Sequence, residues 1–91
     1  MSAVAPDANA RLAPSQRRRL AAAARKRVAR NVDAAMRASG YSQNRLAPRL
    51  GVTQQALSRR LTGDVAFDVD ELAVIARLLN TSVESLVKRG R

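Results

Sequence analysis

Apolar residues recur at every third or fourth position over much of the chain, which is the spacing of one face of an α-helix. In the first half, this series is Leu20, Ala24, Val28, Val32, Ala35 and Met36. It predicts a helix of up to about 24 residues, with Ser15 as its N-cap and with Ser39 and Gly40 at its end. Because the members before Arg25 are mostly alanine, that part is expected either to project from the domain as a helical extension or to form a separate short helix.

Two shorter helices are predicted in the sequence SQNRLAPRLGVTQQALSRRLTG, which spans Ser42 to Gly63. The first ends at Gly51, because a residue without a Cβ atom readily adopts the left-handed conformation that a sharp exit requires. Thr53 is a good N-cap for the second, which is expected to run from Gln54 to Leu61 with Leu57 facing inward. The positions that face outward on the second helix are polar: Gln54, Gln55, Ser58, Arg59 and Thr62.

Pro48 lies inside the first of these two helices. A proline there has no backbone N–H to donate, and its ring clashes with the preceding turn, which costs about 3 kcal/mol in a regular helix. We therefore expect this helix to be kinked or locally tightened.

Two further helices are predicted in the last third of the chain. Asp68 and Glu71 have the spacing of a capping box at the start of the first of them. Its apolar residues are Val69, Leu72, Ile75, Ala76 and Leu79. Asn80 is expected to end this helix. Thr81 and Glu84 repeat the capping-box spacing and are expected to start a last short helix, whose inward residues are Val83, Leu86 and Val87.

Five helices with short connections predict an all-α fold: a compact five-helix domain over residues 15–91, with a basic N-terminal helical extension. The composition favours the same class, since the chain has eighteen alanines and only two aromatic residues, Tyr41 and Phe67, of which Phe67 is assigned to the core. Residues 1–14 have no apolar period and are expected to form a disordered tail. For this tail, a solvated terminus is favoured over an arm that reaches along DNA with Arg11.

The chain contains no cysteine and no histidine, which excludes disulfides, thiolate chemistry, ordinary zinc sites and imidazole catalysis. The acidic residues Asp68, Asp70 and Glu71 are explained by their place at a helix N-terminus. We therefore expect no enzymatic activity, no metal, no cofactor and no small-molecule ligand. No segment has the length and apolarity of a membrane span or a secretory signal, so a soluble protein of the cytoplasm is expected.

The formal net charge of +10 is unevenly distributed along the chain. Residues 1–39 carry nine basic and two acidic side chains, and residues 40–63 carry four basic and no acidic ones. Residues 64–91 carry four basic and five acidic side chains. The first two-thirds of the chain is therefore suited to a polyanion such as nucleic acid, although an anionic membrane surface would feel the same attraction.

Two basic clusters precede the predicted helix pair: Arg17, Arg18 and Arg19, then Arg25, Lys26 and Arg27. A solvated face that improves solubility is the plainest interpretation of such clusters. Because no acidic residue lies among them and a polar helix pair follows, we favour contacts with DNA phosphates. Binding to a membrane surface or a peptide remains a third interpretation.

In their order and spacing, these residues resemble the helix-turn-helix family of the lambda repressor and Cro, also called the XRE family. The resemblance covers roughly residues 25–87, about two-thirds of the chain. Its pieces are Tyr41-Ser42-Gln43, Leu46-Ala47, Leu50-Gly51-Val52, Thr53, Leu57-Ser58-Arg59, Gly63, Glu71-Leu72, Ile75-Ala76 and Leu78-Leu79-Asn80-Thr81-Ser82-Val83-Glu84.

The resemblance implies that the helix from Gln54 to Leu61 is the recognition helix and lies in the major groove of double-stranded DNA. Gln43 matches a family glutamine that contacts a phosphate and hydrogen-bonds the first glutamine of that helix, here Gln54. The residues expected to read bases are Gln54, Gln55 and Ser58. Those expected to bind the DNA backbone are Gln43, Asn44, Arg45, Thr53, Arg59, Arg60 and Thr62, together with the two basic clusters. A polar, exposed helix face without a partner is the alternative for the base-reading set.

Arg60 departs from the family pattern, because the family usually has an apolar residue at this place. Leu61 is expected to take over the packing role of that apolar residue.

Taken together, the sequence predicts a sequence-specific DNA-binding transcriptional regulator, in particular a small repressor of phage or mobile-element type that occupies operator DNA in a bacterial or phage-infected cell and associates with the nucleoid. A homodimer is compatible with this prediction, with the last helix and the N-terminal helix as candidate interfaces. Two alternatives stay open: an antitoxin that regulates a toxin–antitoxin pair, and a nonspecific architectural or RNA-binding basic protein.

Overall fold

The structure is a computed structural model that describes residues 11–90. In this part of the chain there are five helices and no strand, which confirms the all-α fold. The helices are α2 (Pro14–Ser39), α3 (Gln43–Leu50), α4 (Gln54–Leu61), α5 (Val69–Leu78) and α6 (Val83–Val87). The predicted recognition helix therefore has the same bounds as α4. Of the predicted N-terminal tail, residues 1–10 lie outside the described residues.

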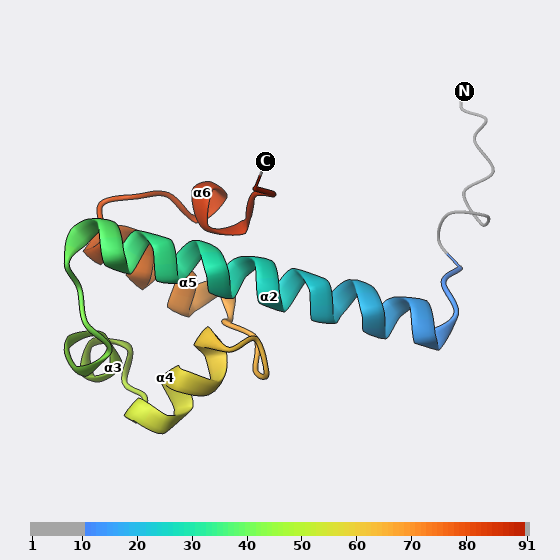
Figure 1. Cartoon of the computed structure of the whole chain (residues 1–91), viewed down its shortest axis with the longest axis horizontal. Helices are drawn as coiled ribbons and strands as arrows, with labels where there is room; N and C mark the ends of the chain where they lie inside the picture. The colour runs from blue at the N-terminus through green and yellow to red at the C-terminus, as the bar shows by residue number, and fades with distance from the viewer. Residues whose placement is uncertain (1–10, 91) are drawn as a thin grey trace.

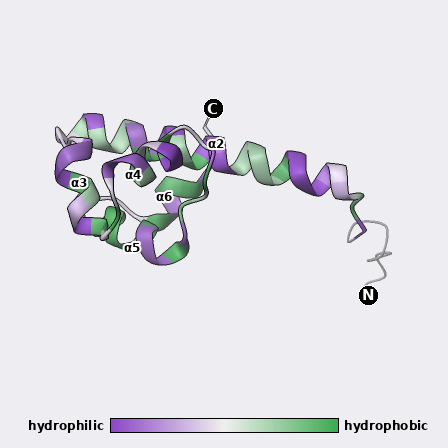
Figure 2. Ribbon diagram, turned by 90° about the horizontal axis from the view of Figure 1, so that it is seen from below, coloured by the Kyte–Doolittle hydropathy of each residue, from purple (hydrophilic) through white to green (hydrophobic). Residues whose placement is uncertain are grey.

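The long helix α2 is the axis of the molecule (Figure 1). It packs against α4 on one side and α6 on another, while α3 packs against α4 and α5, and α5 packs against α6. The part of α2 before Arg25, called the projecting part below, continues past these helices. Both Figure 1 and Figure 2 show it projecting from them. Of the two arrangements expected from the alanine-rich segment, the structure has the continuous helical extension.

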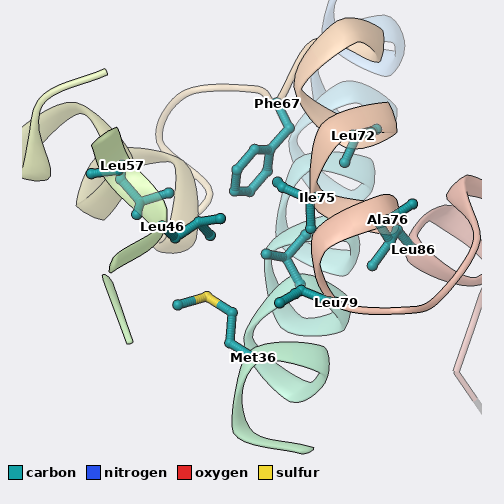
Figure 3. Close-up of a cluster of buried hydrophobic side chains, with 11 residues drawn as sticks. Met36, Leu46, Leu57, Phe67, Leu72, Ile75, Ala76, Leu79 and Leu86 are labelled. Carbon is teal, nitrogen blue, oxygen red and sulfur yellow. The ribbon is translucent and has the colours of Figure 1, made fainter. Parts of the chain in front are cut away.

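One apolar cluster joins all five helices (Figure 3). Its fully buried members include Val32 of α2, Leu46 of α3, Leu57 of α4 and Ile75 of α5. Phe67, in the connection before α5, is also part of this core, as the sequence predicted. Leu61 packs against the edge of the cluster, in the role expected of it. The predicted helices are thus held together by the residues of their apolar faces.

Three predicted inward positions lie on the outside of the domain. Leu20 is 57% exposed, Val69 is 73% exposed and Val87 is 39% exposed. Leu20 is in the N-terminal part of α2, and this part of the helix projects past the others (Figure 1). Val69 is the first residue of α5 and Val87 is the last residue of α6, so each lies at an end where its helix leaves the core.

Two predicted N-caps are wrong by one or two residues. Helix α2 begins at Pro14 after Ala13, whose backbone N–H donates to Gln16 Oε1 at 2.7 Å, so Ser15 is not its N-cap. Proline suits this first position because the N–H it lacks has no partner within the helix. Helix α6 is capped by Ser82, not by Thr81, since Ser82 Oγ accepts a hydrogen bond from the Ser85 backbone N–H at 3.0 Å.

The capping box that opens α5 is confirmed. Asp68 Oδ1 accepts a hydrogen bond from the Glu71 backbone N–H at 2.7 Å, and Glu71 Oε1 accepts one from the Asp68 backbone N–H at 3.1 Å. Asn80 is also confirmed as the residue that ends this helix, since it has a positive φ of 56°. The Thr81 N–H then donates to Ala76 O at 2.8 Å, which satisfies a carbonyl of the last turn.

Candidate nucleic-acid interface

The turn between α3 and α4 is fixed at both of its ends. Gly51 ends α3 with a φ of +73°, and the Val52 N–H donates back to Ala47 O at 3.1 Å. Thr53 Oγ1 then accepts a hydrogen bond from the Ala56 backbone N–H at 3.0 Å, which confirms it as the N-cap of α4. These bonds set the direction in which α4 leaves the turn.

Pro48 lies within α3 without interrupting it, because the helix is continuous from Gln43 to Leu50. The side chain of Arg49 donates to Arg45 O at 2.9 Å in the turn that contains the proline. Pro48 therefore does not shorten α3, which keeps the length that carries its apolar face, and the kink or local tightening expected there stays a prediction.

Helix α4 buries one face and exposes the other. Leu57 is completely buried beneath it, while the proposed base-reading residues Gln54, Gln55 and Ser58 are exposed. Arg59 of the same helix and its C-cap residue Thr62 are also exposed, and the Thr62 hydroxyl donates to Arg59 O at 3.0 Å. Among the described residues, no side-chain hydrogen bond occupies the two glutamines or the Arg59 guanidinium. These groups are therefore available to an external partner.

The start of α3 presents a second exposed polar group, formed by Gln43, Asn44 and Arg45. The hydrogen bond expected between the side chains of Gln43 and Gln54 is not formed within the described residues, and both side chains are exposed. A glutamine pair that is unbonded in the protein alone keeps both amides available to a ligand.

Tyr41 organises the arginines of α3. The Arg45 guanidinium lies 4.4 Å from the centre of the Tyr41 ring, and the Arg49 guanidinium lies 5.9 Å from it. Stacking on an aromatic ring restrains a long side chain while its charge stays in solvent. Arg49 was not among the residues predicted from the sequence. The signal that could have found it is the spacing of four between Arg45 and Arg49, which places both on one face of α3, next to the aromatic residue that precedes the N-cap Ser42.

Arg60, predicted to bind the DNA backbone, is occupied within the protein. Its Nε lies 3.0 Å from Glu71 Oε1, and the two side chains are only 18% and 11% exposed. Its Nη1 donates to Ala56 O at 3.0 Å. The guanidinium therefore ties the end of α4 to the start of α5, and this argues against a phosphate contact by Arg60.

The second basic cluster is also bound to the rest of the domain. Arg25 Nε donates to Gly63 O at 3.1 Å, at the C-terminal end of α4, and Arg27 Nε donates to Val87 O at 3.2 Å in α6. Lys26 is exposed, but its stem packs against Gly63. Arg25 and Arg27 thus connect the long helix to its neighbours: Gly63 directly follows the C-cap of α4, and the Val87 carbonyl belongs to the last turn of α6.

The first basic cluster lies in the projecting part of α2. Arg17, Arg18 and Arg19 are all exposed. The Arg17 Nη1 group donates to Leu12 O at 3.1 Å, whereas Arg18 and Arg19 form no hydrogen bond or ion pair within the described residues. Arg18 and Arg19 are therefore free on the surface of the described residues, whereas Arg25, Arg27 and Arg60 hold the domain together.

Residues 11–90 contain no group of three or more acidic, cysteine or histidine side chains that could hold a metal ion. Within the same residues, no helix has both the length and the apolarity to cross a membrane.

Two short helices joined by a tight turn, with a buried leucine and an exposed polar face on the second, define a helix-turn-helix DNA-binding domain. A comparison with family models gives a match to the helix-turn-helix family over residues 33–86. The chain belongs to this family, in its XRE or lambda-repressor-like form. It is accordingly a DNA-binding transcription regulator, and the family is not an enzyme family. No curated protein and no solved structure gives a match.

Proposed function

We propose that this regulator is a repressor that recognises a specific operator by placing α4 in the major groove. The observation that supports this most directly is the exposed row of Gln54, Gln55 and Ser58 above the buried Leu57. Glutamine offers a donor and an acceptor on one amide, which is the pairing that an adenine edge requires. Gln43, Asn44, Arg45, Thr53, Arg59 and Thr62 would position the helix through phosphates.

We further propose that the protein acts by occupying an operator of a phage or mobile element, and so excluding polymerase or a second regulator. Residues 1–63, which contain the helix pair, carry a net charge of +11, and residues 64–91 carry −1. A basic domain of this kind is attracted to DNA of any sequence and then discriminates by base contacts. A homodimer would bind two half-sites, each with one recognition helix.

The deciding experiment is selection of bound duplexes from a random pool, followed by competition with random duplex DNA. We expect a defined consensus, and a palindromic consensus if the protein binds as a dimer. If random duplex competed as well as the selected sequence at moderate salt, the protein would instead be a nonspecific architectural protein. A tightly co-purifying toxic protein would indicate the antitoxin function.

Gln54→Ala is expected to lower the discrimination between the selected sequence and its single-base variants by about 1–3 kcal/mol, since a bidentate contact to one base is lost. Gln54 is exposed at the start of α4, and alanine is a good helix former, so the fold should be unaffected. Binding to a set of single-base operator variants measures the effect. An equal loss of affinity for operator and random DNA would contradict base reading by Gln54.

Substitutions of two neighbouring arginines of α4 are expected to have different effects on the salt dependence of DNA binding. Arg59→Ala should reduce the slope of log affinity against log salt concentration by about 1, as for the loss of one phosphate contact. Arg60→Met should leave this slope unchanged, because its guanidinium is bound to Glu71 and Ala56. Titrations at several salt concentrations, with circular dichroism to confirm folding, provide the comparison. A reduced slope in the Arg60 variant would show that this arginine leaves Glu71 to bind DNA.

A further inference from the structure

The face of α2 that packs on the recognition helix continues beyond the domain. Arg25 donates to Gly63 O, and a Cβ atom on Gly63 would lie 2.9 Å from Lys26 Cγ, so Arg25 and Lys26 mark the side of α2 turned toward the end of α4. Arg18 and Arg19 stand seven residues before Arg25 and Lys26. Seven residues return a helix to within about 20° of the same direction. Arg18 and Arg19 therefore repeat this face two turns earlier.

No interaction within the domain accounts for the presence of these two arginines. Both are exposed, and neither has a hydrogen-bond or ion-pair partner within the described residues. The extension that carries them projects past α4 and α6 (Figures 1 and 2). From Pro14 to Val32, helix α2 contains no acidic residue. Its charge repels a second copy of the same segment and is complementary to a polyanion.

The distance between the axes of α2 and α4 places the extension where it can contact the DNA backbone. A recognition helix sits in a groove about 8.5 Å deep, and the axes of two packed helices are about 8–10 Å apart. A helix that packs on the protein side of α4 therefore lies near the height of the phosphates that border the groove. Arginine side chains on its α4-facing side can then meet those phosphates directly.

We propose that Arg18 and Arg19 bind phosphates of DNA that flanks the operator, so that the projecting part of α2 lengthens the footprint without reading sequence. This inference rests on the proposed operator binding by α4. Seven helical residues span about 10 Å, which equals about three base pairs of duplex. Arg17 does not belong to this contact, because its Nη1 group donates to Leu12 O.

The test uses duplexes that contain the sequence selected by this protein, with flanks of unrelated sequence from zero to about ten base pairs. The affinity of the unaltered protein should rise over roughly the first three to six flanking base pairs and then reach a plateau. The double variant Arg18→Ala/Arg19→Ala should lose far more affinity on the longest duplex than on the duplex without flanks, and it should gain little from flanks. On the longest duplex, its salt slope should be lower by about 2.

Two variants serve as controls. Arg17→Ala should keep the full gain from flanks, and Arg18→Lys/Arg19→Lys should keep most of it, since a lysine ammonium also binds phosphate. Retention of the gain in the double alanine variant, or an equal loss in Arg17→Ala, would overturn the proposal. If selection yielded no preferred sequence at all, the proposed operator binding would fail, and this inference would fail with it. If the unaltered protein bound the selected sequence on the short duplex but gained no affinity from flanks, only this inference would be refuted.

Discussion

Leu57→Ala is expected to lower the free energy of unfolding by about 2–5 kcal/mol. Leu57 is 0% exposed and is the one fully buried side chain of α4, so its truncation leaves a cavity where the recognition helix meets the core. A domain of this size has a total stability of about 5–15 kcal/mol, so the variant would lose a large part of it. Urea denaturation followed by circular dichroism measures the change.

Leu20→Ala is the matched control, because the same substitution is made on the projecting part of α2. Leu20 is 57% exposed, and surface changes of this kind usually stay within about 0.5 kcal/mol. If the two variants lost similar stability, either the projecting helix would be covered by a partner in solution or α4 would not depend on Leu57 for its attachment.

The helices could be predicted from the sequence because their boundaries are set by local chemistry. Thr53 caps α4 through its own hydroxyl, and Gly51 and Asn80 adopt the positive φ that ends a helix. Such signals involve residues three to five positions apart, so they can be recognised in the sequence without a structure. Where two residues compete for one cap, as Thr81 and Ser82 do, the sequence does not decide between them, and the wrong one was predicted.

The functions of the arginines were much less predictable. Arg25 and Arg27 lie in the same basic cluster as Lys26, yet each donates to a carbonyl far along the chain, 38 and 60 residues away. Arg60 likewise meets Glu71 across two helices. Guanidinium groups reach far and are drawn to the unsatisfied carbonyls of helix ends and to carboxylates. The prediction from charge clusters in the sequence therefore overestimated how many arginines are free to contact DNA.

These internal arginines still have a consequence for DNA recognition. Arg25 fixes the C-terminal end of α4 to α2, and Arg60 fixes its last turn to α5. Because base contacts lose strength when a side chain is displaced by about 1 Å, a firmly attached α4 would be a condition for the base discrimination that we propose for it. The exposed glutamines of α4 are thus presented by a helix that is held at its start by Thr53 and at its end by two arginines.

Gly63→Ala is expected to lower the free energy of unfolding by about 2–5 kcal/mol. Gly63 has a φ of +87°, a conformation that costs other residues about 1–2 kcal/mol. The added Cβ atom would also lie 2.9 Å from Lys26 Cγ and 3.3 Å from Lys26 Cα. Neither atom is at the end of a flexible chain, so α4 and α2 must move apart, at a further cost of about 1–3 kcal/mol.

Gly51→Ala separates these two causes, because Gly51 has a φ of +73° and nothing within 4 Å of its added Cβ atom. It should lose only the backbone part, about 1–2 kcal/mol. Lys26→Ala in the Gly63→Ala background removes Cγ and should restore part of the contact term, which a double-mutant cycle can isolate. Operator binding by the folded protein should fall in Gly63→Ala, because the displaced helix end also loses the bond from Arg25 to Gly63 O. Identical losses of stability in the Gly51 and Gly63 variants, with unchanged operator affinity, would mean that α2 does not set the position of the recognition helix.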